Sequence, residues 1–345
     1  MTTKPVGFRH GFMVIFLGYT THLYANDTAF GGSGSLPIPI SQPDIQMVNE
    51  RIIISGRKLN HAAMNGSWNY HCTFTFQNTR NEAVAITMGF PFPVNTGMSE
   101  VALPDKRQSS EGKALVYDFK VKIDNQPVTA KPQKIAANPD KGLYYEDAYL
   151  WDMTFSPLQT VTIQHDYETG ATYDVMGFHW VSYVLKTGSL WQNNTIGHTT
   201  LEVIPNTPTR LCSEIDPKSD YLQPTPPGMT ITGEGKTRKY SWNLSHFNPS
   251  DDLSLCLYTG KSYVRYQIIL PYLQDEHALD KLRRLSPQQL RILRNTVFAQ
   301  YGRVFTSPKL RQYFKKQWWY EANPNFDIRE LNQEDRQLLA LLNQV

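Results

Sequence analysis

The chain has 345 residues and a mass of 39.6 kDa, with 40% hydrophobic and 19% charged residues. This composition can bury a core, and it is too apolar for an intrinsically disordered chain. Three cysteines exclude a disulfide-dense small scaffold and a zinc site built from four cysteines. The net charge of +3 is too small to indicate nucleic-acid binding, so specific nucleic-acid recognition is not expected.

Residues 1–25 have the three parts of a secretory signal peptide. A basic start with Lys4 and Arg9 precedes the apolar stretch 12–19, and the small residue Ala25 ends the segment. The apolar stretch is shorter than the about 20 residues that span a bilayer. We therefore expect cleavage near Ala25 and an extracytoplasmic protein, periplasmic or secreted, with no transmembrane segment in the mature chain. A buried N-terminal helix is the alternative.

Alternating apolar and polar residues recur from about residue 45 to 270, with the period of half-buried strands. The pattern is clearest where Tyr70, Cys72, Phe74 and Phe76 alternate with polar neighbours. Strands without intervening helices predict antiparallel sheets packed as a β-sandwich, in one lobe or two. The fold class expected is therefore mainly β, with a small α-helical C-terminal domain. Further strands with this pattern are expected at 84–90, 115–123, 161–167 and 264–270.

Four motifs in this region are similar to those of a family of exported bacterial proteins of unknown function. They lie at 74–79 (FTFQNT), 88–93 (MGFPFP), 151–157 (WDMTFSP) and 183–188 (YVLKTG). The resemblance covers most of residues 26–260. It implies a shared fold, and it supplies no catalytic residues to carry over.

The three cysteines allow one disulfide. Cys212 and Cys256 enclose a loop long enough for a bridge to stabilise the fold by roughly 4 kcal/mol through lost chain entropy. Cys72 lies on the inward face of its strand, where a thiol behaves as a small apolar group. We expect the Cys212–Cys256 disulfide with Cys72 free, and the other two pairings or no bridge remain alternatives.

The charge balance changes toward the C-terminus. Residues 26–274 contain 20 basic and 23 acidic residues, whereas residues 275–345 contain 12 basic and 8 acidic residues. This shift predicts a domain boundary near residue 272, with a β-sandwich-like domain at 26–272 and a helical domain at 273–345. Helix starts are expected where Ser286 precedes Pro287, where Ser307 precedes Pro308, and at Asn332.

This C-terminal stretch resembles the YARHG domain, a bacterial extracellular module. The similarity runs from residues 290–295 through Tyr313-Phe314 and Trp319-Tyr320 to Leu331. At the signature the chain reads Phe298-Ala299-Gln300-Tyr301-Gly302, which keeps the alanine and the glycine but lacks the arginine and the histidine. The loss of charge and acid–base capacity leaves a structural or binding role for the motif.

We find no catalytic or metal-binding pattern. No two histidines have the i, i+4 spacing of a zinc protease, and neither a nucleophile elbow nor a phosphate-binding loop occurs. His165 lies on an apolar strand face and is expected to be a core histidine. We therefore predict no catalytic residues, no metal and no cofactor. A secreted glycan hydrolase is the enzyme alternative, because aromatic side chains surround the carboxylates of Asp140, Glu146, Asp147 and Asp152.

Residues 281–320 carry ten basic and no acidic residues. Our leading hypothesis is an exported, non-enzymatic cell-envelope protein whose basic helical module binds an anionic wall or surface polymer. A solvated helix face that pairs with the acidic body would explain the same charges. Another alternative is an extracellular scaffold that binds a second envelope protein. The candidate ligand-binding residues are Arg291, Arg294, Arg303, Lys309, Arg311, Lys315 and Lys316, with Trp318 and Trp319 as stacking partners.

Overall fold

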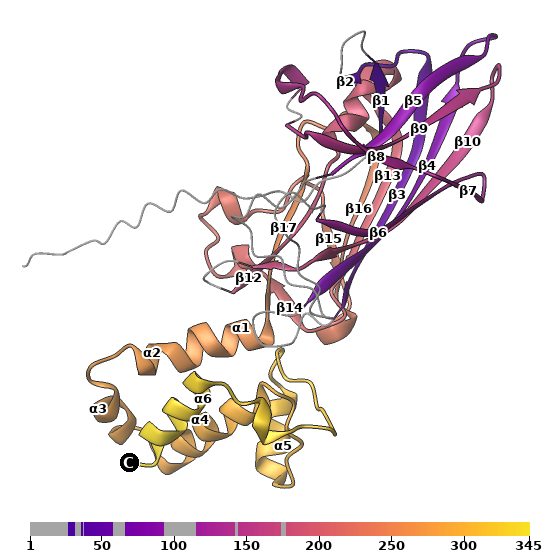
Figure 1. Ribbon diagram of the computed structural model, residues 1–345. Helices are drawn as coiled ribbons and strands as arrows, with labels where there is room; N and C mark the ends of the chain where they lie inside the picture. The colour runs from indigo at the N-terminus through magenta and orange to yellow at the C-terminus, as the bar shows by residue number, and fades with distance from the viewer. Residues whose placement is uncertain are drawn as a thin grey trace, which may run out of the picture.

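The computed structural model describes residues 27–31, 36, 38–57, 66–92, 115–141, 144–173 and 177–345. It has a β-rich body followed by a bundle of short helices at the C-terminus (Figure 1), so the expected fold class is confirmed. The expected signal peptide, residues 1–25, lies outside the described residues. Within the described ranges, every helix is too short or too polar to cross a membrane.

The largest sheet has eight strands in the order β15-β16-β13-β3-β4-β10-β6-β7. All neighbours run antiparallel except β3 and β13, which are parallel with Ile52 opposite Leu201. This one parallel pair departs from the purely antiparallel sheets expected from the alternation. The strands are β3 (Ile45–Arg57), β4 (Ser67–Asn78), β6 (Val116–Ile123), β7 (Gln126–Val128), β10 (Thr160–Gly170), β13 (Ile196–Ile204), β15 (Thr230–Thr232) and β16 (Lys239–Phe247).

Two smaller antiparallel sheets complete the body. One has the order β2-β1-β5-β9-β8, and the other has the order β11-β12-β17-β14. The first comprises β1 (Thr28–Gly31), β2 (Ile38–Ile40), β5 (Val84–Pro91), β8 (Lys131–Lys134) and β9 (Asp147–Phe155), and the second comprises β11 (Thr172–Tyr173), β12 (Phe178–Tyr183), β14 (Thr209–Leu211) and β17 (Leu253–Thr259). Single 3₁₀ turns lie at η1 (Pro139–Lys141), η2 (Lys186–Leu190), η3 (Gln192–Asn194), η4 (Cys212–Glu214), η5 (Asp220–Leu222) and η6 (Gly235–Thr237).

One hydrophobic core joins the three sheets. Phe74 comes from the eight-stranded sheet, Trp151 from the five-stranded sheet and Leu255 from the four-stranded sheet, and all three are buried in the same cluster. The alternation of apolar and polar residues predicted for β4 is confirmed, because Cys72, Phe74 and Phe76 are all fully buried. Because burial of apolar surface is the main stabilising term, this shared core holds the body together as one unit.

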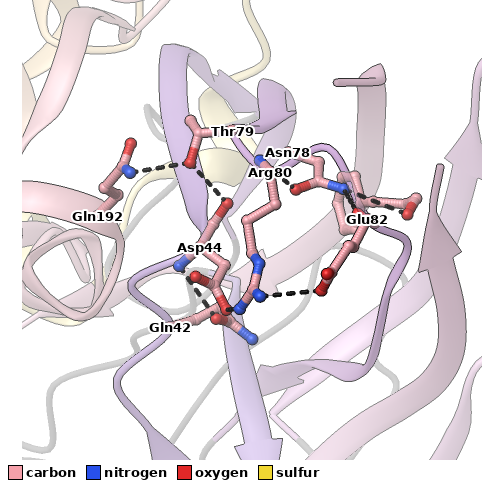
Figure 2. A network of polar contacts seen from close by, with 8 residues as sticks. Gln42, Asp44, Asn78, Thr79, Arg80, Glu82 and Gln192 are labelled. Carbon is pink, nitrogen blue, oxygen red and sulfur yellow. Dashed lines mark hydrogen bonds and ion pairs between the residues drawn. The ribbon is translucent and has the colours of Figure 1, made fainter. Parts of the chain in front are cut away.

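A buried amide closes the turn after β4. Asn78 is fully buried, and its Nδ2 donates to the backbone oxygens of Glu82 at 2.8 Å, Ser156 at 2.9 Å and Phe155 at 3.4 Å. Its Oδ1 accepts a hydrogen bond from the backbone nitrogen of Arg80 at 2.9 Å. One side chain therefore connects the turn after β4 to the turn after β9 (Figure 2).

Exposed ion pairs and hydrogen bonds lie next to the buried amide of Asn78. The Arg80 guanidinium lies 2.9 Å from a Glu82 carboxylate oxygen and 3.3 Å from one of Asp44. Thr79 Oγ1 donates to the backbone oxygen of Asp44 and accepts from Gln192 Nε2, as Figure 2 shows. Surface ion pairs of this kind contribute little to stability, so the buried amide of Asn78 supplies most of the stabilisation in this region.

The expected disulfide joins Cys212 to Cys256, and Cys72 is a buried free thiol. Cys212 directly follows β14 and Cys256 lies on β17, so the bridge links two neighbouring strands of the four-stranded sheet. The two cysteines pack with Tyr258 and with the partly buried ring of Trp318 from the helical domain. The bridge therefore lies at the contact between the body and the helices.

The strand expected at 264–270 is wrong, because this segment is helical. β17 ends at Thr259, whose Oγ1 accepts from the backbone nitrogen of Ser262 and so begins helix α1 without a linker. A π-turn separates α1 from α2 and places the buried residues Val264 and Ile269 five apart. Alternating apolar residues arise here from a helix with an irregular turn, not from a strand.

The remaining helices begin where their caps were expected. Ser286 and Asn332 form capping boxes with Gln289 and Asp335, and Ser307 precedes the helix that starts at Pro308. Their apolar faces share one core with α1 and α2. The helical elements are α1 (Gly260–Val264), the π-turn η7 (Arg265–Ile269), α2 (Leu270–Leu273), α3 (Ala278–Arg283), α4 (Pro287–Ala299), α5 (Pro308–Lys315), the 3₁₀ turn η8 (Ile328–Glu330) and α6 (Gln333–Leu342).

We predict that Asn78→Ala lowers the free energy of unfolding by roughly 2–3 kcal/mol, because three carbonyl groups lose a buried donor. Urea unfolding followed by tryptophan fluorescence measures the change. Arg80→Ala is the matched control, since it removes the exposed ion pairs and leaves the amide in place. The conclusion that the buried amide of Asn78 supplies most of the stabilisation is wrong if Arg80→Ala destabilises the protein as much as Asn78→Ala.

Removal of the disulfide should lower the free energy of unfolding by about 2–4 kcal/mol, because the bridge closes a long loop in the unfolded chain. The two cysteines are 44 residues apart. The double variant Cys212→Ser/Cys256→Ser and the reduced wild-type protein should unfold at similar urea concentrations. Reductant should leave the stability of the double variant unchanged. A further loss of stability in the reduced double variant would show that Cys72 contributes to the effect of the reductant.

Candidate functional site

The seven candidate cations of the helical domain lie on α4, the loop after it and α5. We call Arg291, Arg294, Arg303, Lys309, Arg311, Lys315 and Lys316 the basic segment. All are exposed except Arg294, which is half-buried and donates to the backbone oxygen of Leu342 and to Asn343 Oδ1. Arg291 donates to Ser307 Oγ at 3.3 Å, and the Arg303 guanidinium lies 4.9 Å from the Phe298 ring centroid.

None of these seven side chains forms an ion pair with an acidic residue in the described part of the chain. Five of the eight acidic side chains of residues 275–345 bind other Lys or Arg side chains instead. These pairs are Asp275 with Lys281, Asp280 with Arg283, Glu321 with Lys236, Asp327 with Arg329, and Glu334 with Arg265. The positive charge of the basic segment is therefore left on the surface.

The two candidate tryptophans lie in packing contacts. Trp319 is only 6% exposed and contacts Phe314 in the helical core. The ring of Trp318 is half-buried, and the Arg210 guanidinium lies 4.9 Å from its centroid. The centroid of the Tyr258 ring lies 5.5 Å from it in a T-shaped arrangement. Because body residues cover Trp318 and neighbouring helices cover Trp319, neither indole is available as a stacking platform beside the basic segment.

Asp147 and Asp152, two carboxylates of the hydrolase alternative, do not form a facing pair. Asp147 and Asp152 lie on opposite faces of β9, because they are five residues apart on one strand. At about 3.3 Å per residue their Cα atoms are roughly 16 Å apart, beyond the about 5–10 Å of glycosidase carboxylates. Asp147 is ion-paired with Lys134 at 2.7 Å, and Asp152 accepts a hydrogen bond from Thr87. This geometry gives no support to sugar hydrolysis.

His165 is a core histidine, as expected. It is fully buried among the rings of Phe74, Phe90 and Trp151, and its Nε2 lies 3.3 Å from Asp27 Oδ1. Burial lowers the pKa of His165 to about 3, so the imidazole is neutral at physiological pH. Within the described residues, no group of three or more His, Cys, Asp or Glu side chains could hold a metal ion.

The residues at the YARHG signature take part in a buried polar group that the sequence analysis did not predict. Tyr301 donates its hydroxyl to Asp335 Oδ2 at 2.6 Å, and Gln300 Nε2 donates to Asp335 Oδ1 at 2.7 Å. The backbone nitrogen of Asn332 also donates to Asp335 Oδ2. Burial raises the pKa of Asp335, and these three hydrogen bonds oppose the rise. The capping-box spacing from Asn332 to Asp335 was the only signal of this group in the sequence.

Two family models match parts of this chain. The YARHG domain family matches residues 265–345, and a domain of unknown function, DUF4424, matches residues 25–142. None of the curated proteins compared with the chain matches it.

Among the solved structures, one relative is similar over nearly the whole chain. The crystal structure of a candidate nutrient-binding protein from Legionella pneumophila subsp. pneumophila str. Philadelphia 1 is 63% identical, with a TM-score of 0.83. The alignment covers 92% of this chain and 99% of that protein. An M1 zinc metallopeptidase from Deinococcus radiodurans is 8% identical over 64% of this chain and 44% of its own, with a TM-score of 0.30. The chain therefore belongs to the same family as the Legionella protein, and it carries a DUF4424 domain followed by a C-terminal YARHG domain.

Proposed function

We propose that this protein is an extracytoplasmic, non-enzymatic binding protein whose basic segment holds an anionic polymer of the cell envelope. The observation that carries the proposal is the surface charge. Seven cations lie on α4, α5 and the adjoining loop without an ion-paired acidic residue among the described residues, while five carboxylates of the helical domain bind other cations. Distributed cations of this kind attract polyanions with weak specificity and strong salt dependence.

Two further findings support a binding role. The Legionella relative is described as a candidate nutrient-binding protein, which is a binding function and not a catalytic one. The YARHG match agrees with the extracellular module that the sequence resembles. Phosphate-rich wall polymers, lipopolysaccharide phosphates and anionic lipids share the chemistry that the basic segment would recognise.

The test is co-sedimentation of the purified protein with isolated cell envelopes over a series of salt concentrations. We expect the wild-type protein to sediment at low salt and to dissociate as salt rises. The triple variant Arg291→Glu/Arg311→Glu/Lys315→Glu should lose about tenfold or more in apparent affinity, because three attractive charges become repulsive.

A matched control has the same change in net charge on the body. Lys122, Lys131 and Lys218 are exposed, and Lys122→Glu/Lys131→Glu/Lys218→Glu should keep wild-type sedimentation. If both triple variants bind equally well, the basic segment does not carry the binding. If both lose binding equally, net charge and not this surface is responsible.

A further inference from the structure

A cavity of about 370 Å³ lies where the body meets the helical domain. Its walls come from the loop around Thr207, the start of α1, the signature residues after α4, and the segment from Trp319 to Pro324. Ligand pockets of folded proteins are typically about 300–1,000 Å³, so a small solute fits this volume. The basic segment contributes no residue to its lining.

Two glycines allow the walls to approach each other. A Cβ atom on Gly260 would lie 2.6 Å from Trp319 Cβ and 2.7 Å from its backbone oxygen. Gly302 has a φ of +82°, and a Cβ there would lie 2.5 Å from the backbone oxygen of Glu321. The glycine of the YARHG signature is therefore required by the shape of this cavity wall.

One cation, Lys261, lines the cavity without forming an ion pair, although the charges of Glu330 and Asp335 act on it. The Lys261 ammonium lies 4.2 Å from the centroid of the Tyr301 ring. In the described part of the chain it has neither an ion pair nor a hydrogen-bond acceptor on another side chain. Because an ammonium group has three donors, Lys261 retains hydrogen bonds for a group that enters the cavity. The aromatic ring holds the ammonium in place.

The lining also carries one carboxylate without a cationic partner. Glu321 is ion-paired with Lys236 at 2.9 Å, and Asp335 behind the cavity accepts hydrogen bonds from Tyr301 and Gln300. Glu330 lines the cavity, and its carboxylate forms no ion pair with any described residue. The cavity therefore presents one positive and one negative charge, which act on each other electrostatically but form no ion pair.

These two charges select the kind of ligand. A purely anionic solute bound to Lys261 would be repelled by the negative charge of Glu330. A purely cationic solute bound to Glu330 would be repelled by the positive charge of Lys261. A solute that carries both charges satisfies both groups. We propose that the cavity binds a small zwitterion of the amino-acid class, with its carboxylate on Lys261 Nζ and its ammonium toward Glu330. This site is separate from the polymer-binding surface proposed above.

Equilibrium dialysis of the purified protein against the twenty protein amino acids at equal concentrations tests the proposal, with mass spectrometry to identify what the protein retains. We expect at least one amino acid to be enriched. The enriched amino acid is then compared with its decarboxylated amine and its deaminated acid. Each analogue should bind about tenfold or more weakly, because one charge in the cavity loses its partner.

Variants assign the binding to the cavity. Lys261→Met and Glu330→Gln should each weaken binding about tenfold or more, whereas Lys261→Arg should keep part of it. Lys131→Met, at an exposed lysine of β8 away from the cavity, is the matched control and should bind as wild type. Glu330 is exposed, so Glu330→Gln keeps the test valid even if a change at Lys261 disturbs folding. Failure to enrich any amino acid, or unchanged binding in both variants, would overturn the proposal.

Chemical labelling gives a second readout. Burial lowers the pKa of Lys261 to about 8, while Glu330 and Asp335 act in the opposite direction. Acetylation of Lys261 by acetic anhydride should therefore rise with a midpoint near pH 8, and Glu330→Gln should move the midpoint lower. The enriched amino acid should protect Lys261 from acetylation. Equal labelling with and without that amino acid would contradict binding at this lysine.

Discussion

The direct passage from β17 into α1 is the constraint on which the rest of the molecule depends. Thr259 ends the strand and caps the helix, so no linker separates the body from the helical domain. The disulfide fixes β17 against β14, and the aromatic ring of Trp318 packs on the same cluster. The Lys236–Glu321 ion pair adds a second contact across the junction. A cavity can persist between the two domains because these contacts hold them in one arrangement.

Local sequence patterns predicted much of the fold. The alternation around Phe74 and the helix caps at Ser286 and Asn332 were predicted from residue types at short spacing, and the structure confirms them. The disulfide was predicted from the number and places of the cysteines, and it is also confirmed. The segment around Val264 was mistaken for a strand, because a π-turn removes the three- and four-residue spacing that identifies a helix. Pattern methods are weakest where a helix is irregular.

The candidate site depended on contacts that no local pattern contains. The cations were visible as a charge run, yet their lack of partners depends on where Glu321 and Glu334 lie in space. The cavity joins residues near 207, 261, 301 and 330, and its one unpaired cation lies outside the charge run. Departures from the YARHG signature at Gln300 and Tyr301 looked like a loss of function, but both side chains bind Asp335.

The parallel pair of β3 and β13 has a consequence for how this chain folds. Residue Ile52 reaches its neighbour Leu201 only after about 150 further residues have been made, and such distant pairing slows folding. The DUF4424 match ends at residue 142, before β10, β13 and β16 of the same sheet. A fragment cut at that point would keep the β3–β4 pair but leave unpaired the edge of β3 that binds β13 and the edge of β4 that binds β10. The unit of folding is therefore the whole β body, and the boundaries of the sequence family do not define it.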